Sequence, residues 1–346
     1  MGEPRVLVVG AGISGVLLAR RLRDAGADAV LIGPHGGGAA GRPADATAAS
    51  GGLMRAFEPD PAARSLAAAS LAELLADPSL ATAAGWRRTG SLYLLDARAA
   101  AGVDGAEVLT RADADRFGFA GLPDGTVGIW EDRAGYLDPD RLRRTVLRGL
   151  GRTETTPVAR LDDRVVELRD GRRLTGDLVV VAAGAWTPRL LGAAGLPTSL
   201  RTKHIQYAHH VTGRAELPCF VDETSGLYGR PAGPGRMLLG LPSDRWDVDP
   251  PSPEPDAALA ARVLTVAARR LPGLDPRPAG PPVSATDCYS EPAGLALRHV
   301  SGAVHTFTGG SGGAAKTVLA ASRLAATALL NTRTAIPVPH GQTEAD

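Results

Sequence analysis

The first apolar positions of the chain form a short run that ends in a glycine turn. Residues 5–9 (RVLVV) are typical of a strand buried in a parallel sheet, and Gly10-Ala-Gly12-Ile-Ser-Gly15 follows at once. Apolar residues then recur with a helical period up to Gly26, with arginines on the opposite face, and residues 29–32 are again strand-like. This strand–turn–helix–strand order is the setting that a dinucleotide-binding glycine fingerprint requires.

The remaining hydrophobic pattern alternates between helical and strand-like segments. Helices are predicted over residues 61–84 (one or two), 138–150, 256–271 and 316–330. Strands are predicted over 91–95, 126–130, 177–182, 200–211 and 303–307, with a hairpin over 163–174 that turns at Asp170-Gly171. A second glycine-rich turn, residues 309–313, joins the last strand to the last helix.

This order predicts an α/β protein with a Rossmann-like nucleotide-binding domain and a sheet-rich α+β second domain for the substrate. The nucleotide-binding domain is discontinuous in sequence, formed by residues 1–85, 140–200 and 290–332. The substrate-binding domain takes residues 86–139 and 201–289. Residues 333–346 are expected to be a flexible tail.

Composition narrows the function without naming it. The chain has 346 residues, a net charge of +1, 44% hydrophobic and 22% charged residues, which excludes a disordered chain. No cluster of Lys or Arg predicts nucleic acid or a membrane surface as a partner. Two cysteines cannot form a disulfide scaffold, and the N-terminal apolar run is too short for a signal peptide, so a cytoplasmic location is expected.

At residues 179–188 (VVVAAGAWTP) the sequence resembles a known family. It looks like an FAD-dependent oxidoreductase of the D-amino-acid oxidase superfamily, in the branch of monomeric sarcosine oxidase and glycine oxidase. The N-terminal fingerprint, residues 89–93 (TGSLY), 135–139 (GYLDP) and 309–316 (GGSGGAAK) agree in order and approximate spacing. The resemblance implies two domains, bound FAD and hydride transfer to flavin N5 from a C–H bond next to an amine nitrogen.

The glycine motifs and the resemblance together assign the FAD-binding residues. A glycine at position 12 lets the pyrophosphate approach the backbone, and the helix that begins near residue 13 offers free N–H groups and a positive dipole end. The predicted FAD contacts are Gly10, Gly12, Ile13, Ser14, Gly15, His35, Ser50, Gly51, Ala183, Gly184, Trp186, Gly310, Ser311, Gly312 and Lys316.

The resemblance also assigns three catalytic residues at the substrate. Arg55, in Ser50-Gly-Gly-Leu-Met-Arg55, and Lys316 match an arginine and a lysine that clamp the substrate carboxylate. A guanidinium fork and an ammonium that converge on one carboxylate suit an amino-acid ligand. Lys316 is one of only two lysines among 38 basic residues, the other being Lys203. Tyr289 matches a tyrosine of the substrate pocket.

Two departures from the family pattern bear on FAD. The second strand should end in an acidic residue that binds the adenosine ribose, and Gly33 stands there instead. Either His35 or a backbone group replaces that contact, or FAD is held less tightly. Some relatives bind FAD through a cysteine thioether two residues before the pocket tyrosine, where this chain has Asp287. Cys288 is adjacent, so we expect non-covalent FAD, with a link at Cys288 as the alternative.

A third departure bears on oxygen. The sarcosine oxidase branch carries a lysine that promotes the reaction with oxygen, and Leu238 occupies that position here. Either another cation, Lys203 or Arg236, takes its place, or the electrons pass to a different acceptor. His209 and His210 are adjacent on a predicted strand and cannot both face one metal, so no metal site is expected.

The sequence therefore leads to one main hypothesis and two alternatives. The main one is oxidation of a primary or secondary amine of an amino-acid-like substrate to the imine, with oxygen as acceptor and peroxide as product. The arginine-rich composition, typical of a GC-rich genome, favours a tailoring step in specialised metabolism. The alternatives are an amine or hydroxy-acid dehydrogenase with another acceptor, and a flavoprotein subunit without turnover.

Overall fold

The computed structural model describes residues 3–34, 45–100, 107–213, 217–250 and 253–334. Its helices are α1 (Ile13–Asp24), α2 (Pro61–Ala76), α3 (Pro78–Ala83), α4 (Arg111–Asp115), α5 (Pro139–Leu150), α6 (Thr187–Ala193), α7 (Ala257–Arg270) and α8 (Ala314–Thr334). Short 3-10 turns occupy η1 (Ala97–Ala100) and η2 (Gly184–Trp186).

The strands alternate with these helices along the chain. They are β1 (Arg5–Val9), β2 (Asp28–Ile32), β3 (Leu53–Met54), β4 (Arg87–Arg88), β5 (Ser91–Asp96), β6 (Glu107–Leu109), β7 (Thr126–Glu131), β8 (Gly135–Tyr136), β9 (Val158–Asp162) and β10 (Val165–Leu168). The second half contains β11 (Arg173–Thr175), β12 (Leu178–Val181), β13 (Arg201–Val211), β14 (Cys219–Asp222), β15 (Leu227–Pro231), β16 (Arg236–Gly240), β17 (Arg277–Pro278), β18 (Val283–Tyr289), β19 (Ala296–Ser301) and β20 (Val304–Thr308).

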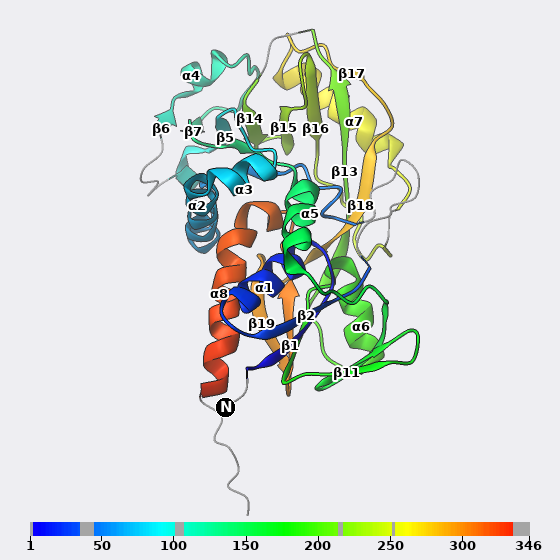
Figure 1. The fold of residues 1–346 in the computed structure, drawn as a ribbon. Helices are drawn as coiled ribbons and strands as arrows, with labels where there is room; N and C mark the ends of the chain where they lie inside the picture. Colours follow the sequence, from blue (N-terminus) through cyan, green and yellow to red (C-terminus); the bar gives the residue numbers. More distant parts are fainter. Residues whose placement is uncertain (1–2, 35–44, 101–106, 214–216, 251–252, 335–346) are drawn as a thin grey trace, which may run out of the picture.

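One part of the fold is built on a five-stranded sheet in the order β19-β20-β12-β1-β2. Its inner strands are parallel and buried on both faces, as their continuous apolar runs require. One face packs against α1, α2, α5 and α8, and the other packs against α6 and the small sheet β11-β10-β9. Figure 1 shows this doubly wound arrangement, with β1 and β2 beneath α1 and α8 along one side.

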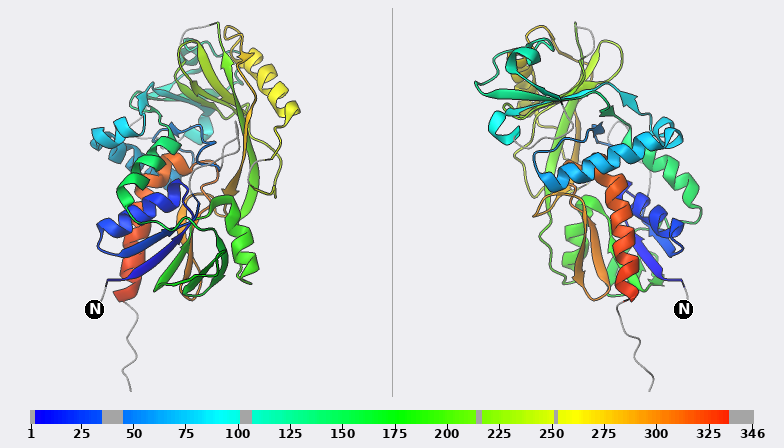
Figure 2. Two further views of the ribbon diagram at one scale, coloured as in Figure 1. Left: turned by 45° about the vertical axis from the view of Figure 1, so that its right-hand side comes forward. Right: turned by 90° about the vertical axis from the view of Figure 1, so that its left-hand side faces the viewer.

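The second system is a nine-stranded sheet in the order β17-β13-β16-β15-β14-β5-β7-β6, with β18 paired to β13. Helix α7 and the segment around α4 cover one face of this sheet, where Phe220, Leu239 and Val263 belong to a separate apolar core. Both views of Figure 2 show this sheet above the five-stranded sheet, and β13 and β18 extend from one sheet toward the other. The opposite face of the nine-stranded sheet lines the cavity described below.

The structure confirms the α/β class and refines the predicted elements. Each of the predicted strands and helices is present in the described residues, and the 61–84 segment is two helices. Helix α8 begins two residues earlier than predicted and continues to Thr334, two residues into the stretch expected to be a tail; residues 335–346 lie outside the described residues. Several strands were not predicted, among them β14, β15, β18 and β19, because polar residues within them interrupt the period of two.

Candidate active site

A cavity of about 860 Å³ lies between the two sheet systems. Val9, Ile32 and Ala182 line one end of it, at the carboxyl ends of the parallel strands β1, β2 and β12. Ligands of doubly wound sheets bind at this edge. The other end is lined by side chains of the nine-stranded sheet, including Tyr207 and Tyr228.

The turn after β1 is shaped for very close backbone approach. Gly10 has φ of +116°, and a Cβ atom on Gly15 would lie 1.9 Å from the Gly10 carbonyl oxygen. The backbone conformation at Gly10 and the close backbone contact at Gly15 therefore require glycine at both positions, whether or not a ligand is bound. A Cβ on Gly12 would meet only Thr47 Oγ1, at the ordinary distance of 3.4 Å. Gly12 lines the cavity at the start of α1, so a ligand pressed against the backbone explains this glycine better than protein packing does.

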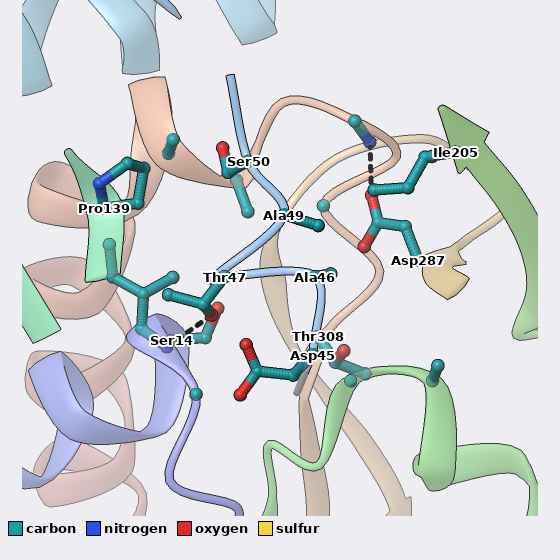
Figure 3. Close-up of a pocket in the computed structure, with 18 of the residues that line it drawn as sticks. Ser14, Asp45, Ala46, Thr47, Ala49, Ser50, Pro139, Ile205, Asp287 and Thr308 are labelled. Atoms are coloured by element: carbon teal, nitrogen blue, oxygen red, sulfur yellow. Dashed lines mark hydrogen bonds between the residues drawn. The ribbon is translucent and has the colours of Figure 1, made fainter. Parts of the chain in front are cut away.

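The segment from residue 45 to 52 crosses the cavity beside this turn (Figure 3). Thr47 Oγ1 accepts a hydrogen bond from Ile13 N at 3.1 Å, which ties the segment to the first turn of α1. Asp45 accepts from Ala48 N at 2.9 Å and forms an ion pair with the buried Arg143. Arg143 also pairs with Asp140, so its positive charge offsets part of the Asp45 charge that would repel a phosphate nearby.

Most residues predicted to contact FAD line this one cavity. They are Gly10, Gly12, Ile13, Ser14, Ser50, Gly51, Ala183, Gly184, Trp186, Gly310, Gly312 and Lys316. Gly15 packs against Gly10 instead, and the Ser311 hydroxyl donates to the Gly309 carbonyl at 3.1 Å, so neither lines the cavity. His35 lies outside the described residues.

No carboxylate replaces the missing acid at the end of β2 in the described structure. Gly33 lines the cavity, and its N–H donates to the Glu154 carbonyl at 2.8 Å. The Glu154 carboxylate is already used, by Arg172 at 2.6 Å and by Thr156 N at 2.8 Å. Arg169 is the charged side chain that lines this end beside Gly33 and Pro34.

The two predicted clamp residues, Arg55 and Lys316, converge on a third residue. Arg55 Nη2 and Lys316 Nζ each lie 2.8 Å from the same oxygen, Oε1 of Glu58. All three side chains are nearly buried, with 7%, 15% and 14% of their surfaces exposed. The two cations are thus brought together as predicted, but around a carboxylate of the chain itself.

Burial and the neighbouring guanidinium perturb the lysine of this triad. Desolvation, followed by repulsion from Arg55, lowers the pKa of Lys316 from its ordinary value of 10.5 to about 8, although Glu58 opposes the change. The charged form of Lys316 is therefore poorly stabilised in the free protein. An added anion would restore that stabilisation.

A half-buried glutamate on β7, Glu131, holds the loop that carries Arg55 and Glu58. Glu131 Oε1 accepts hydrogen bonds from Ala56 N at 2.8 Å and from Phe57 N at 3.1 Å. Burial raises the pKa of Glu131 despite these bonds. Arg55 itself donates to the Phe57 carbonyl at 3.1 Å, and its guanidinium lies 5.0 Å from the centre of the Tyr93 ring.

Tyr289, the third predicted catalytic residue, lines the same cavity in an aromatic cluster with Trp246 and Lys203. The Tyr289 and Trp246 rings meet edge to face at 5.2 Å, and Lys203 Nζ lies 4.5 Å from the Trp246 ring and 5.3 Å from the Tyr289 ring. Burial raises the pKa of Tyr289 above its ordinary value, so the phenol stays protonated. No ion pair of Lys203 is found in the described part of the chain.

Residues 287 and 288 face different environments. Asp287 lines the cavity and accepts from Gly312 N at 3.1 Å and from Cys288 N at 2.8 Å (Figure 3). Cys288 is buried, does not line the cavity, and its pKa is raised to about 11 by burial. A thiol in that state is a poor nucleophile.

Leu238 is fully buried in β16 and does not line the cavity. Its cross-strand neighbour Arg230 donates to the Gly51 carbonyl at 2.5 Å and lies over the Tyr136 ring. Arg236 is exposed and stands away from the cavity lining. Of the two substitute cations considered above, only Lys203 lines the cavity.

The described residues contain no group of three or more His, Cys, Asp or Glu side chains that could hold a metal ion. None of the described helices combines the length and the apolar composition needed to cross a membrane.

The fold and the cavity are typical of a dinucleotide-binding protein in which a doubly wound domain shares its ligand site with a second sheet. Residues 5–328 match the family of FAD dependent oxidoreductases known as DAO. The chain belongs to this family and is an FAD-dependent oxidoreductase. A comparison with curated proteins found no significant match.

Solved structures with the same fold include several oxidases. Glycine oxidase from Geobacillus kaustophilus superposes with a TM-score of 0.75 at 18% identity, covering 95% of both chains. Iminodiacetate oxidase from Chelativorans sp. BNC1 gives 0.70 at 23% identity, over 97% of this chain and 96% of that one. NikD, described as an unusual amino acid oxidase essential for nikkomycin biosynthesis, gives 0.74 at 21%, over 97% and 96%. At these identities the likeness shows the fold.

Sequence reasoning missed several residues of the site. Thr47, Glu223 and Tyr228 of the cavity lining were not singled out, nor was Glu58, which pairs with two lining residues, and Asp287 was noted only as the residue in place of a cysteine. Glu58 follows Arg55 by three positions, and this spacing could have predicted that the two residues form an ion pair. Glu223 and Tyr228 reach the cavity only because β14 and β15 enter the large sheet, which the hydrophobic pattern did not reveal.

Proposed function

We propose that the protein oxidises a primary or secondary amine of an amino-acid-like substrate to the imine. The observation that carries this proposal is the convergence of Arg55 and Lys316 on one buried carboxylate oxygen, beside a cavity with a dinucleotide turn at its other end. Glu58 occupies the position that a ligand carboxylate would need. The site is thus built to bind a carboxylate in a desolvated place, where charge-assisted hydrogen bonds are strongest.

In this proposal a substrate carboxylate binds to Arg55 and Lys316 and either displaces Glu58 or shares the cations with it. The triad carries two cations and one anion when Lys316 is protonated, so one positive charge remains for the incoming carboxylate. Binding raises the pKa of Lys316 and keeps its Nζ protonated. Tyr228 and Tyr207, on the facing sheet, exclude water from the carbon chain of the substrate.

FAD, when bound, supplies the two-electron acceptor that takes a hydride from the carbon next to the substrate amine. The residues that would hold it are the glycine turn and the start of α1, Thr47, the turn at Ala183–Gly184, and the glycines before α8. The chain's own part is to orient the amine and keep it dry. We propose non-covalent FAD, because Cys288 is buried outside the cavity lining and Asp287 takes the position of the linking cysteine.

We propose oxygen as the electron acceptor, with peroxide as product. Lys203 supports this choice, because its ammonium lines the cavity beside Tyr289 without a carboxylate partner among the described residues. A positive charge there would stabilise negative charge that develops as oxygen is reduced. Leu238 favours the alternative, a dehydrogenase that passes electrons to a quinone or a protein.

The test is a peroxide assay on matched pairs of amines, each an amino acid and the amine that remains after loss of its carboxylate. We expect turnover of at least one amino acid and none of its decarboxylated partner. Arg55→Met and Lys316→Met should each raise KM for that amino acid without loss of bound flavin. Equal turnover of both members would refute the carboxylate clamp. Reduction of flavin without peroxide in air would instead support the dehydrogenase.

A further inference from the structure

Glu223 is a charged residue of the cavity lining to which the reaction proposed above gives no part. Glu223 follows directly after β14, and its N–H donates to the Leu94 carbonyl at 2.9 Å, which extends the pairing of β14 with β5 by one residue. The backbone of Glu223 is therefore fixed by the sheet. Its side chain is exposed to solvent at the cavity, so it stands at the open side of the same space that Arg55 and Lys316 line.

A buried tyrosine connects Glu223 to the carboxylate clamp. The Tyr93 hydroxyl donates a hydrogen bond to the Glu223 carboxylate, while the Tyr93 ring lies under the Arg55 guanidinium at 5.0 Å and against Phe57 at 5.1 Å. Burial raises the pKa of Tyr93 well above its ordinary value, so the hydroxyl remains a donor. Tyr93 thereby fixes where the carboxylate points relative to the clamp.

The Glu223 carboxylate keeps acceptor capacity that the described structure does not use. A carboxylate has about four acceptor sites, and Tyr93 fills one of them. No Lys, Arg or His forms an ion pair with Glu223 within the described ranges, whereas Glu58 has two cationic partners. Glu223 is thus an exposed carboxylate of the cavity lining with acceptor sites left for a ligand, whereas both oxygens of Asp287 already accept from backbone N–H groups.

The wall between the two charged sites is apolar or aromatic. Val221 lies opposite both Tyr93 and Tyr228 in the register of the sheet, and Tyr207 lies opposite Gly240 on the same face. A Cβ on Gly240 would lie 2.4 Å from the Tyr228 ring, so only glycine at this position leaves room for the ring. This surface suits the methylene groups of a ligand that bears a charge at each end.

We propose that Glu223 forms a subsite for a cationic hydrogen-bond donor, an ammonium or guanidinium group, at the end of the substrate remote from its carboxylate. The inference rests on the proposed function and narrows it. The substrate class becomes amino acids with a basic side chain, bound by their carboxylate at Arg55 and Lys316 and by their distal cation at Glu223. The charges of the site complement such a ligand at both ends.

The test uses ligands that lack an oxidisable α-amine. The holoenzyme is titrated with ω-guanidino carboxylates of increasing chain length, each compared with an alkanoate of the same length that ends in an isopropyl group. Binding is followed by the change in the visible spectrum of the bound flavin. At one chain length or more, we expect the guanidino ligand to bind about tenfold more tightly than its alkanoate, as a charge-assisted hydrogen bond at a partly solvated site allows.

Glu223→Gln should reduce this preference to about one while leaving alkanoate binding unchanged. Glu107→Gln, which removes an exposed glutamate of β6 outside the cavity lining, is the matched control and should keep the full preference. The wild-type comparison is informative even if a variant fails to fold. Alkanoate binding without guanidino preference at any length would overturn the Glu223 subsite and leave the carboxylate clamp intact. Absence of binding by either ligand would overturn both.

Discussion

If Lys316 binds the substrate carboxylate as proposed, we expect that binding to depend on pH in a definite direction. The pKa of Lys316 falls from 10.5 to about 8 on burial, which corresponds to about 3 kcal/mol lost from the charged form. With this pKa, Lys316 is about 90% protonated at pH 7 and about 10% protonated at pH 9. Only the protonated form attracts an anion, so affinity is highest below the pKa and decreases as the pH rises through it.

The assay is a titration of the holoenzyme with a short alkanoate, whose carboxyl group stays ionised over this whole range. The dissociation constant should increase about tenfold between pH 7 and pH 9 if the neutral form of Lys316 does not bind the ligand. The change in the visible flavin spectrum reports the bound fraction.

Two variants isolate the contribution of Lys316. Lys316→Arg keeps a positive charge at every pH tested, so its dissociation constant should not change between pH 7 and pH 9. Lys316→Met should bind weakly and also without a pH dependence. A wild-type affinity that stays constant from pH 7 to pH 9, or a dependence that persists in Lys316→Met, would refute this reasoning.

The remaining predictions concern other residues of the cavity. Glu58→Gln should lower the pH at which alkanoate affinity begins to decrease to below 8, because Glu58 raises the pKa of Lys316. An unchanged pH would show that Glu58 does not act on Lys316. Gly15→Ala, whose Cβ would lie 1.9 Å from a backbone oxygen, should lower the unfolding free energy of the apoprotein by about 1–3 kcal/mol in denaturant melts. Gly12→Ala should leave that stability within about 1 kcal/mol but weaken FAD binding; unaltered FAD affinity would place the pyrophosphate elsewhere. Lys203→Met should slow reoxidation of the reduced flavin by oxygen by about tenfold or more in stopped-flow experiments, with substrate reduction unchanged, whereas equal reoxidation rates would remove Lys203 from this role.

The sequence predicted the doubly wound domain because its signals are local. The run at residues 5–9, the glycines at 10, 12 and 15, and the helical period that follows lie within one stretch of chain, and burial on both faces makes the strands uniformly apolar. The second glycine turn before α8 was found for the same reason. These elements also carry most of the cavity lining that was predicted.

The large sheet was harder to predict, because its cavity side is partly polar. Strands β14 and β15 carry Asp222, Arg230 and a glycine, which interrupt the alternation expected of a half-buried strand. Their contribution to the cavity depends on the pairing of β14 with β5, which lies far away in sequence. Glu223 could therefore not be placed near Arg55 before the sheet order was known.

The clamp illustrates a further limit of sequence reasoning. Arg55 and Lys316 lie more than 250 positions apart in the chain. They were assigned to one site because their motifs resemble those of a family, and no physical signal in the sequence links them. That Glu58 joins them, and that Glu131 holds their loop from another strand, follows only from the folded structure.

The central claim is that this cavity binds an amino-acid-like amine against FAD and oxidises it. The most direct measurement is the visible absorption spectrum of the purified holoprotein under anaerobic conditions, before and after addition of individual amino acids, including basic ones. We expect flavin bands that bleach with at least one amino acid and recover when air is admitted. A protein that holds no flavin after incubation with FAD, or a flavin that no amino acid reduces, would contradict it.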